Sequence, residues 1–135
     1  MLHLEIITPE RIAYTDEVNL VTVPSVLGTM GVLPRHIPLF AQLTEGEIKI
    51  KKDNDEIYLS IGGGFIEVTK SKVIVLVTRA VHYKELNEVE ILKARKEALE
   101  ALKQKPTGKE LIGAQVLLRQ SLVDLHVLRR RKTIH

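Results

Sequence analysis

The sequence contains no cysteine and no long apolar run. With 0 cysteines among 135 residues, the chain has neither a disulfide framework nor a thiolate metal site. The longest apolar stretches are residues 73–77 and 116–118, far short of the ~20 residues that a membrane-spanning helix needs. The first residues lack a basic segment followed by an apolar one, so we expect neither a secretory signal nor a transit peptide.

Positive charge is scarce in most of the chain and gathers near its C-terminus. Residues 1–84 carry 9 lysines and arginines against 10 acidic residues, whereas residues 85–135 carry 11 against 7. Four of these cations are consecutive, at positions 129–132. An anionic partner is therefore expected to meet this basic tail. Nucleic acid is disfavoured as that partner, because none of the five aromatic residues lies near the tail for base stacking.

No set of residues has the spacing of a catalytic or metal site. The five histidines are scattered and form neither a His-x-x-Glu-His nor a His-x3-His pattern. The Gly-x-Ser-x-Gly turn of serine hydrolases is absent too. Acidic pairs such as Glu45/Glu47 lie in hydrophilic surroundings that give no reason for a raised pKa. We therefore predict no enzyme activity, no cofactor, no nucleotide site and no metal ion.

The run Gly62-Gly63-Gly64 does not fit a phosphate-binding loop. No Lys-Ser/Thr follows it, and the residues after it are typical of a strand rather than of a helix. Glycine within a strand pattern marks a bend or a close backbone approach. We expect this run to turn the chain from one sheet to another.

Up to about residue 85, apolar residues alternate or occur in short β-branched groups. Residues 46–52 alternate cleanly, and the turn residues 53–55 separate them from a second alternating segment that ends at Ile61, which predicts a hairpin. Residues 65–77 predict a second hairpin, and residues 18–23 a strand that ends at Pro24. Many short strands with frequent turns indicate an antiparallel sandwich or barrel.

Residues 28–40 are unusually rich in glycine and proline. Pro34 and Pro38, together with two glycines, preclude a helix and disfavour a long interior strand. The segment is therefore predicted to be a structured loop, and such loops often bind partners. His36 lies between the prolines without partners for a metal site, so a backbone hydrogen bond that holds the loop is the preferred interpretation.

After residue 85 the apolar spacing becomes helical. Asn87 followed by Glu90 predicts a capping box at the start of a first helix, which Pro106 and Gly108 end. Its expected apolar stripe is rich in alanine and consists of Ile91, Ala94, Ala98, Ala101 and Leu102.

A second helix of about 20 residues is expected after the Lys-Pro-Thr-Gly turn, so the two helices form an antiparallel hairpin. Its stripe consists of Leu111, Ala114, Leu118, Leu122, Leu125 and Leu128. Leu117, Val123 and Val127 lie off this stripe. They either pack on the predicted sandwich or serve a hairpin that exchanges partners, and the sequence leaves both options open.

Four segments, taken in order along nearly the whole chain, resemble the epsilon subunits of rotary, F-type ATP synthases. Residues 31–40, Gly-Val-Leu-Pro-Arg-His-Ile-Pro-Leu-Phe, resemble the family segment Gly-Ile-x-Pro-Gly-His-x-Pro-Leu. Residues 63–68, Gly-Gly-Phe-Ile-Glu-Val, resemble the motif Gly-Gly-Phe-x-Glu-Val. Residues 4–12 are similar to the Val-Thr-Pro start of the family, and residues 73–80 to its Val-Thr-Val-Leu-x-x-x-Ala strand.

The resemblance implies an α+β fold: an N-terminal antiparallel β-sandwich of about ten strands at 1–84, then a C-terminal antiparallel two-helix hairpin at 85–135. It also implies a non-catalytic rotor subunit of the central stalk, which couples proton flow to ATP synthesis and has the gamma subunit and the c-ring as partners. Such a subunit is peripheral to the membrane through its complex, on the cytoplasmic face of a bacterium or the stromal side of a plastid.

Two groups of site residues follow from the resemblance. The family loop that carries the Pro-x-His segment lies toward the c-ring, so the expected gamma and c-ring contacts are Thr29, Met30, Gly31, Pro34, Arg35 and His36. In many members the hairpin can extend along gamma and inhibit ATP hydrolysis, with basic residues near acidic loops of the alpha/beta catalytic ring. Arg129, Arg130 and Arg131 would have that role here.

The sequence departs from the family pattern at three places. Arg35 stands where the family usually has glycine, and Thr78 replaces a common aspartate. Some bacterial members bind ATP through Ile/Leu-Asp-x-x-Arg-Ala at the start of the first helix, where this chain has Leu-Asn-Glu-Val-Glu-Ile at 86–91. A glutamate would repel a triphosphate, so weak or no ATP binding is predicted. The alternative to the rotor role is a generic β-sandwich interaction module whose basic helical tail binds an anionic partner.

Overall fold

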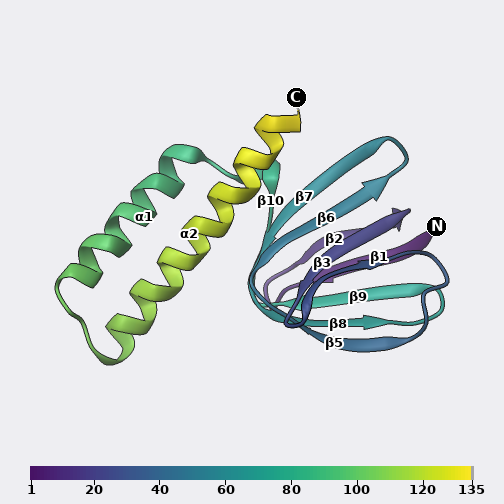
Figure 1. Ribbon diagram of the computed structural model, residues 1–135, viewed down its shortest axis with the longest axis horizontal. Coiled ribbons are helices and arrows are strands. Elements are labelled where there is room, and N and C mark those ends of the chain that lie inside the picture. The colour runs from purple at the N-terminus through teal and green to yellow at the C-terminus, as the bar shows by residue number, and fades with distance from the viewer. Residues whose placement is uncertain (135) are drawn as a thin grey trace. The chain divides into compact units, whose positions relative to one another are not determined.

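The computed structural model describes the backbone of residues 1–134 and the side chains through Arg130. The chain divides into two compact units, Met1–Tyr83 and Lys84–His135. Strands make up the first unit and two helices the second (Figure 1). Each unit is described by itself below.

The first unit contains ten strands. They are β1 (Leu2–Ile7), β2 (Ile12–Val18), β3 (Leu20–Ser25), β4 (Gly28–Val32), β5 (Leu39–Leu43), β6 (Gly46–Lys52), β7 (Asp55–Ile61), β8 (Gly64–Val68), β9 (Lys72–Val77) and β10 (Ala80–His82). A short 3-10 helix, η1 (Tyr83–Glu85), follows. The predicted hairpins β6–β7 and β8–β9 are both present.

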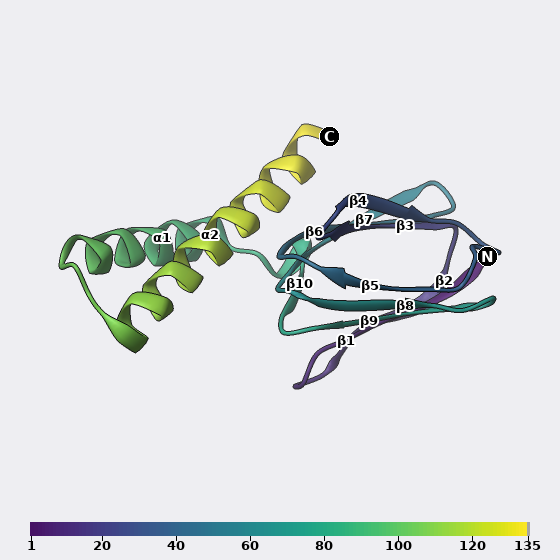
Figure 2. The same ribbon diagram turned by 60° about the horizontal axis from the view of Figure 1, so that its bottom comes forward.

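The strands form two facing layers, which Figure 2 shows nearly edge-on. One layer has the order β10-β7-β6-β3-β4 and the other β5-β8-β9-β1-β2. The layers join where Ser25 of β3 pairs with Leu43 of β5. Among the described strands, the pairing is antiparallel except between β1 and β9, which run parallel. The predicted sandwich of about ten strands is therefore confirmed, with one parallel pair that local sequence did not indicate.

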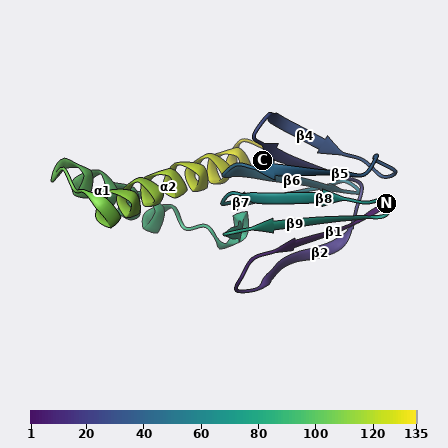
Figure 3. The same ribbon diagram turned by 90° about the horizontal axis from the view of Figure 1, so that it is seen from below.

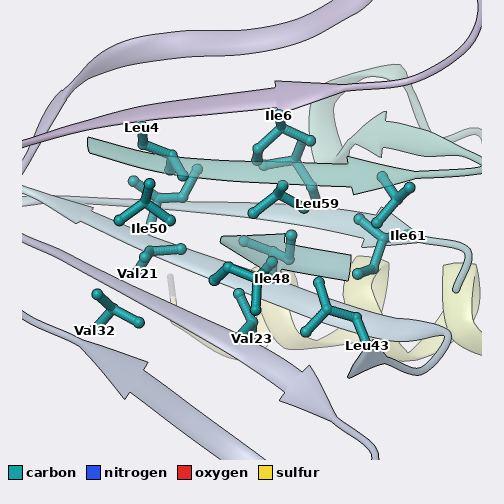
Figure 4. Close-up of a cluster of buried hydrophobic side chains, with 14 of the residues drawn as sticks. Leu4, Ile6, Val21, Val23, Val32, Leu43, Ile48, Ile50, Leu59 and Ile61 are labelled. Atoms are coloured by element: carbon teal, nitrogen blue, oxygen red, sulfur yellow. The ribbon is translucent and has the colours of Figure 1, made fainter. Parts of the chain in front are cut away.

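The core lies between the two layers and takes every second residue from most strands. In β1, buried residues alternate with partly exposed ones, and Leu4 and Ile6 are completely buried. Ile48 and Ile50 of β6 and Leu59 and Ile61 of the neighbouring β7 belong to the same buried cluster (Figure 4). Burying each such side chain contributes roughly 1.5–3 kcal/mol. This alternation fixes which residues of each strand point outward.

Two local predictions were wrong. Pro24 does not end β3, which continues to Ser25. Proline is tolerated there because its position falls where the partner of β3 changes from β6 to β5, and its carbonyl still accepts a hydrogen bond from the Thr44 amide at 2.8 Å. Residues 28–32 are not loop but form β4, since a tight turn folds them back on β3, helped by a positive φ of 123° at Gly28. The actual loop is 33–38.

The glycine run crosses between the layers, as predicted. It connects β7 of one layer to β8 of the other. A Cβ atom on Gly64 would lie 1.9 Å from the Leu76 carbonyl oxygen and 2.8 Å from the Val77 Cα. Backbone atoms cannot move aside as a flexible side chain can, so this crossing requires a residue without a side chain.

The second unit is an antiparallel pair of helices, α1 (Glu88–Lys103) and α2 (Gly108–Ile134). The Asn87 side chain caps α1 by accepting a hydrogen bond from the Glu90 amide at 3.1 Å. Ile91 near the start of α1 packs with Leu125 and Leu128 in the later half of α2. The predicted hairpin is therefore present, but α2 has 27 residues rather than about 20.

The seam of α2 also differs from the predicted stripe. Leu122 is 49% exposed, whereas Ser121 is buried and donates a hydrogen bond to the Leu117 carbonyl at 2.7 Å. The buried positions Ala114, Ser121 and Leu128 are seven residues apart. Two packed helices repeat their contacts every seven residues, whereas a stripe drawn for one straight helix drifts by ~20° in each such repeat. The inclusion of Leu122 was wrong for this reason.

Residues Gly108–Arg130 form a helix that is long and apolar enough to cross a membrane. The sequence places Arg119 and Asp124 within this stretch, and a charge at the bilayer centre costs at least ~2.5 kcal/mol. About a third of the segment, 33%, is buried inside the structure. We therefore interpret α2 as the core helix of the hairpin.

The Gly64→Ala substitution should destabilise the sandwich by about 1–3 kcal/mol or more, because the added methyl group overlaps backbone atoms. Urea unfolding followed by tyrosine fluorescence measures this, since all three tyrosines lie in the first unit.

Gly113→Ala is the matched control. Apart from the backbone of its own helix, nothing approaches within 4 Å of the added methyl group, and alanine favours a helix interior by up to ~1 kcal/mol. This variant should leave the tyrosine transition unchanged and raise the stability of the helical circular dichroism signal. Equal tyrosine midpoints for Gly64→Ala and the unsubstituted chain would contradict the packing argument.

Candidate protein interaction site

The six predicted contact residues lie on β4 and on the loop after it. Thr29, Met30 and Gly31 belong to β4, whereas Pro34, Arg35 and His36 belong to the loop 33–38. Thr29 and Gly31 are exposed, while Met30 is half-buried and packs on the core. The two groups are separated along the strand, with Thr29 next to the β3–β4 turn and the loop at the other end of β4.

The loop 33–38 is held by backbone hydrogen bonds around His36. The His36 amide donates to the Leu33 carbonyl at 3.2 Å, and the His36 Nδ1 lies 2.7 Å from the Ile37 carbonyl oxygen. Because a carbonyl oxygen only accepts, Nδ1 must carry the proton. This bears out the interpretation of His36 as a residue that holds the loop through the backbone.

Arg35 has a φ of 67°, in the left-handed region that favours glycine. The strain costs an L-residue roughly 1–2 kcal/mol. The family segment resembled by residues 31–40 has glycine at this position, so the backbone keeps the bend although the side chain has changed. Arg35 is exposed, and its charge is therefore presented at the end of the sandwich.

An apolar patch on the outer face of β5, β8 and β9 was missed from the sequence. Phe40, Phe65 and Leu76 are 65%, 46% and 50% exposed, and the two phenyl rings stack with centroids 5.3 Å apart. Patches of this kind on a soluble protein mark interaction sites. The sequence did hold a signal for it. In a half-buried strand apolar residues alternate with polar ones, but Phe65 and Leu76 are apolar and stand directly beside apolar core residues. We call Phe40, Phe65 and Leu76 the apolar patch.

A shallow pocket of about 410 Å³ adjoins the apolar patch. Phe65 and Leu76 line it together with Ile7 and Pro9, and the glycine crossing at 63–64 forms part of its wall. An apolar pocket beside exposed aromatic rings can accept an apolar side chain of a partner.

The tip of the β3–β4 hairpin exposes further apolar side chains. Leu27 is 97% exposed, and its neighbour Val26 is also exposed. Ser25 closes this turn by donating its hydroxyl proton to the Gly28 carbonyl at 2.6 Å. The sequence pattern gave no role to these two residues, because turn positions carry no periodicity.

Ion pairs tie together strands at the surface of the sandwich. Lys72 of β9 binds Glu5 of β1 at 3.3 Å and holds the pKa of that carboxyl below its usual value. Lys52 of β6 pairs with Asp16 of β2, across the two layers, and likewise lowers the pKa of Asp16. Both carboxyl groups have a lowered pKa and therefore stay ionised at neutral pH. They suit ion pairing rather than proton transfer. Among the described residues no cluster of three or more metal-ligating side chains occurs.

The predicted basic tail lies in the last turns of α2. Arg129 and Arg130 are exposed, and cations at this end of a helix interact favourably with its dipole. The side chain of Arg131 lies outside the described residues.

Comparisons with known proteins decide the family. The family model of the ATP synthase, Delta/Epsilon chain, beta-sandwich domain matches residues 1–83. The ATP synthase epsilon chain of Herpetosiphon aurantiacus is 36% identical over 131 residues, which are 97% of this chain and 96% of that one. The chain belongs to the ATP synthase epsilon-chain family. The resemblance seen in residues 31–40 and 63–68 is thereby confirmed.

Further relatives agree with this family over both units. The ATP synthase epsilon chain of Chloroflexus aggregans is 33% identical over 137 residues, covering 98% of this chain and 99% of that one. A chain in the cryo-EM structure of the Euglena gracilis mitochondrial ATP synthase, containing OSCP, F1 and the c-ring, has a TM-score of 0.68 at 22% identity. The match covers 99% of this chain and 81% of that one. At this identity the structural likeness shows the fold alone.

Arg35→Gly should stabilise the sandwich by about 0.5–1 kcal/mol, because glycine removes the left-handed strain but has more freedom in the unfolded chain. Arg35→Ala is the control, since it removes the same charge and keeps the strain. Urea midpoints followed by tyrosine fluorescence compare the two variants. If they are equally stable, the strain at position 35 is not a stability determinant.

Proposed function

We propose that this chain is a non-catalytic rotor subunit in the central stalk of an F-type ATP synthase, where it couples proton flow to ATP synthesis. The observation that carries the proposal is the match to ATP synthase epsilon chains over 97% of this chain, sandwich and hairpin included. The two core layers agree with the role, because a part that transmits torque must not deform. Close-packed interiors of this kind are stiff.

The proposed partner of the apolar patch is the gamma subunit. Beneath the patch lie Ile66 and Val75, which are fully buried in the core, so force applied to the phenyl rings reaches both layers. Aromatic residues that are supported by a packed core are typical binding hot spots. The pocket beside Phe65 and Leu76 adds a place for an apolar side chain of gamma.

The proposed partner of the loop 33–38 is the c-ring. Pro34 and Pro38 fix its backbone, and His36 bonds to the Ile37 carbonyl within it. Arg35 then offers a charge from a loop of defined shape. The exposed Leu27 at the tip of the β3–β4 hairpin adds a second contact, which is apolar rather than charged. With these partners the chain is peripheral to the membrane, on the cytoplasmic face of a bacterium or the stromal side of a plastid.

Phe40→Ala and Phe65→Ala should each weaken binding to purified cognate gamma subunit by about 30-fold, the effect of losing a hot-spot aromatic side chain. Isothermal titration calorimetry of the full chain with gamma measures the affinity. Circular dichroism of each variant should be unchanged, because neither ring belongs to the buried core.

Lys51→Ala is the control for these variants. Lys51 is exposed on the outer face of β6, in the layer that does not carry the apolar patch. It should bind gamma as the unsubstituted chain does. Unchanged affinity in both phenylalanine variants would remove the patch from the interface, and no binding by the unsubstituted chain would refute the rotor assignment.

The hairpin is proposed to inhibit ATP hydrolysis in the assembled enzyme. The surface of the helices supports this proposal. Val89 and Ile112 are exposed apolar residues, and Arg129 and Arg130 place positive charge at the surface. Arg131, from the same basic run, is proposed to act with them. Acidic loops of the alpha/beta catalytic ring would pair with these arginines. A shift between mostly folded and mostly extended hairpins needs ~5.5 kcal/mol of differential binding.

Deleting residues 85–135 should raise ATP hydrolysis by the assembled synthase about fivefold, which is the low end of typical allosteric coupling. A full-length variant with Arg129, Arg130 and Arg131 replaced by glutamine should show part of the same rise, because it keeps the helices and loses the charges. Steady-state hydrolysis assays compare the three enzymes. An equal rate in all of them would exclude inhibition by the hairpin and leave the rotor role intact.

A further inference from the structure

Glu67 is a charged residue that adjoins the apolar patch. It belongs to β8, which lies between β5 and β9 and pairs with both (Figure 3). In this register Glu67 stands directly opposite Phe40 of β5 and Ile74 of β9, and Leu76 is its diagonal neighbour. Glu67 and Phe65 are two residues apart on β8 and both are exposed, so their side chains share the outer face of the layer. The carboxylate therefore lies among the side chains of the apolar patch.

Other carboxylates of the sandwich are paired with lysines. Lys72 binds Glu5 at 3.3 Å in the same layer, and Lys49 binds Glu56 at 3.3 Å in the other layer. In the part of the chain that the structure describes, Glu67 takes part in no ion pair or side-chain hydrogen bond. Since Glu67 is exposed, solvent stabilises its charge in the free chain.

A partner that covers the apolar patch covers Glu67 as well. Phe40 stands opposite the carboxylate on one side and Ile74 on the other, so a surface seated on these side chains displaces the water around it. Taking an ionised carboxylate out of water without a counter-charge costs more than the burial of one apolar side chain returns. The partner must therefore place a cation at this position.

The aromatic rings beside Glu67 select which cation fits. The Phe40 and Phe65 rings stack with centroids 5.3 Å apart, next to the carboxylate. A guanidinium group binds a carboxylate through two parallel N–H···O bonds and also stacks on aromatic faces. A lysine ammonium is a compact and strongly hydrated charge that loses more water when it is buried. Arginine is thus the side chain that satisfies both the charge and the rings.

We propose that the surface of gamma that covers the apolar patch carries an arginine that pairs with Glu67. The inference rests on the proposed function, in which gamma is the partner of the patch. Apolar contacts are not directional, so Phe40, Phe65 and Leu76 alone leave gamma free to shift across the patch. The pair with Glu67 is directional and fixes the position of gamma on the sandwich.

Glu67→Gln tests the inference, because glutamine keeps the size of the side chain and removes its charge. The full chain with this substitution should bind purified gamma at least about tenfold more weakly, since the arginine of gamma is then buried without a counter-charge. The loss should lie in faster dissociation, whereas the association rate changes little. Surface plasmon resonance measures both rates. Unchanged affinity, or a change in the association rate alone, would overturn the inference.

Asp55→Asn is the matched control. Asp55 is an exposed residue at the start of β7, in the layer that does not carry the apolar patch. The substitution changes the net charge by the same amount as Glu67→Gln, so it measures the general attraction between gamma and the chain. It should change the affinity by less than about twofold. Equal losses for the two variants would show a general charge effect and would overturn the pairing.

A double-mutant cycle identifies the arginine. Each arginine of purified gamma is replaced by alanine in turn, and each variant is measured against the unsubstituted chain and against Glu67→Gln. One of these replacements should weaken binding to the unsubstituted chain at least about tenfold and binding to Glu67→Gln much less, because the pair is already broken there. If no arginine of gamma is coupled to Glu67 in this way, the inference is wrong.

This inference and the proposed function fail in distinguishable ways. If the unsubstituted chain does not bind gamma, the proposed function fails. If Phe40→Ala weakens binding and Glu67→Gln does not, gamma covers the patch without such an arginine, and only the inference is wrong. If neither substitution weakens binding, another part of the synthase, such as the c-ring, covers the patch. That outcome overturns the inference and leaves the rotor assignment intact.

Discussion

The shared core between the two layers constrains everything else in the first unit. Each strand that contributes to it must point alternate side chains inward, as Leu4 and Ile6 do in β1, and shifting a strand by one residue would turn its apolar side chains outward. Adjacent residues of a strand point to opposite faces, so Phe65 and Leu76 must face solvent when their neighbours Ile66 and Val75 point into the core. The apolar patch is thus a consequence of the same alternation that builds the fold.

Because the core lies between two layers, the chain must cross from one layer to the other. The crossing at Gly64 lies beside the apolar patch. Gly64 lies against the backbone at Leu76 and Val77, where no side chain fits. The same residues border the pocket beside the apolar patch. The site and the crossing therefore depend on one another, because a change at the crossing would displace the strands that hold Phe65 and Leu76.

The helical unit is built on a different principle and leaves more apolar surface uncovered. Two helices cover each other only along one seam, so Val89, Ile112 and Leu122 remain exposed. The sandwich encloses its core between two layers, whereas the buried apolar cluster of the hairpin consists of Ile91, Leu125 and Leu128. This difference agrees with the proposed roles of a rigid body that carries torque and an arm that changes its contacts.

The sequence by itself determined that residues 1–84 are rich in short strands, the two hairpins β6–β7 and β8–β9, the helical hairpin with its Asn87 cap, and the family, because alternation, turn residues and capping act within a few neighbours. Only the tertiary structure decided that β1 and β9 run parallel, that β4 is an open edge and that Pro24 lies inside a strand, since these depend on which strands meet. It likewise decided that Phe40 and Phe65 stack and that Ser121 rather than Leu122 fills the helical seam. The β1–β9 pairing and the Phe40–Phe65 stack join residues that lie 25 or more positions apart along the chain, and no local pattern encodes such distances.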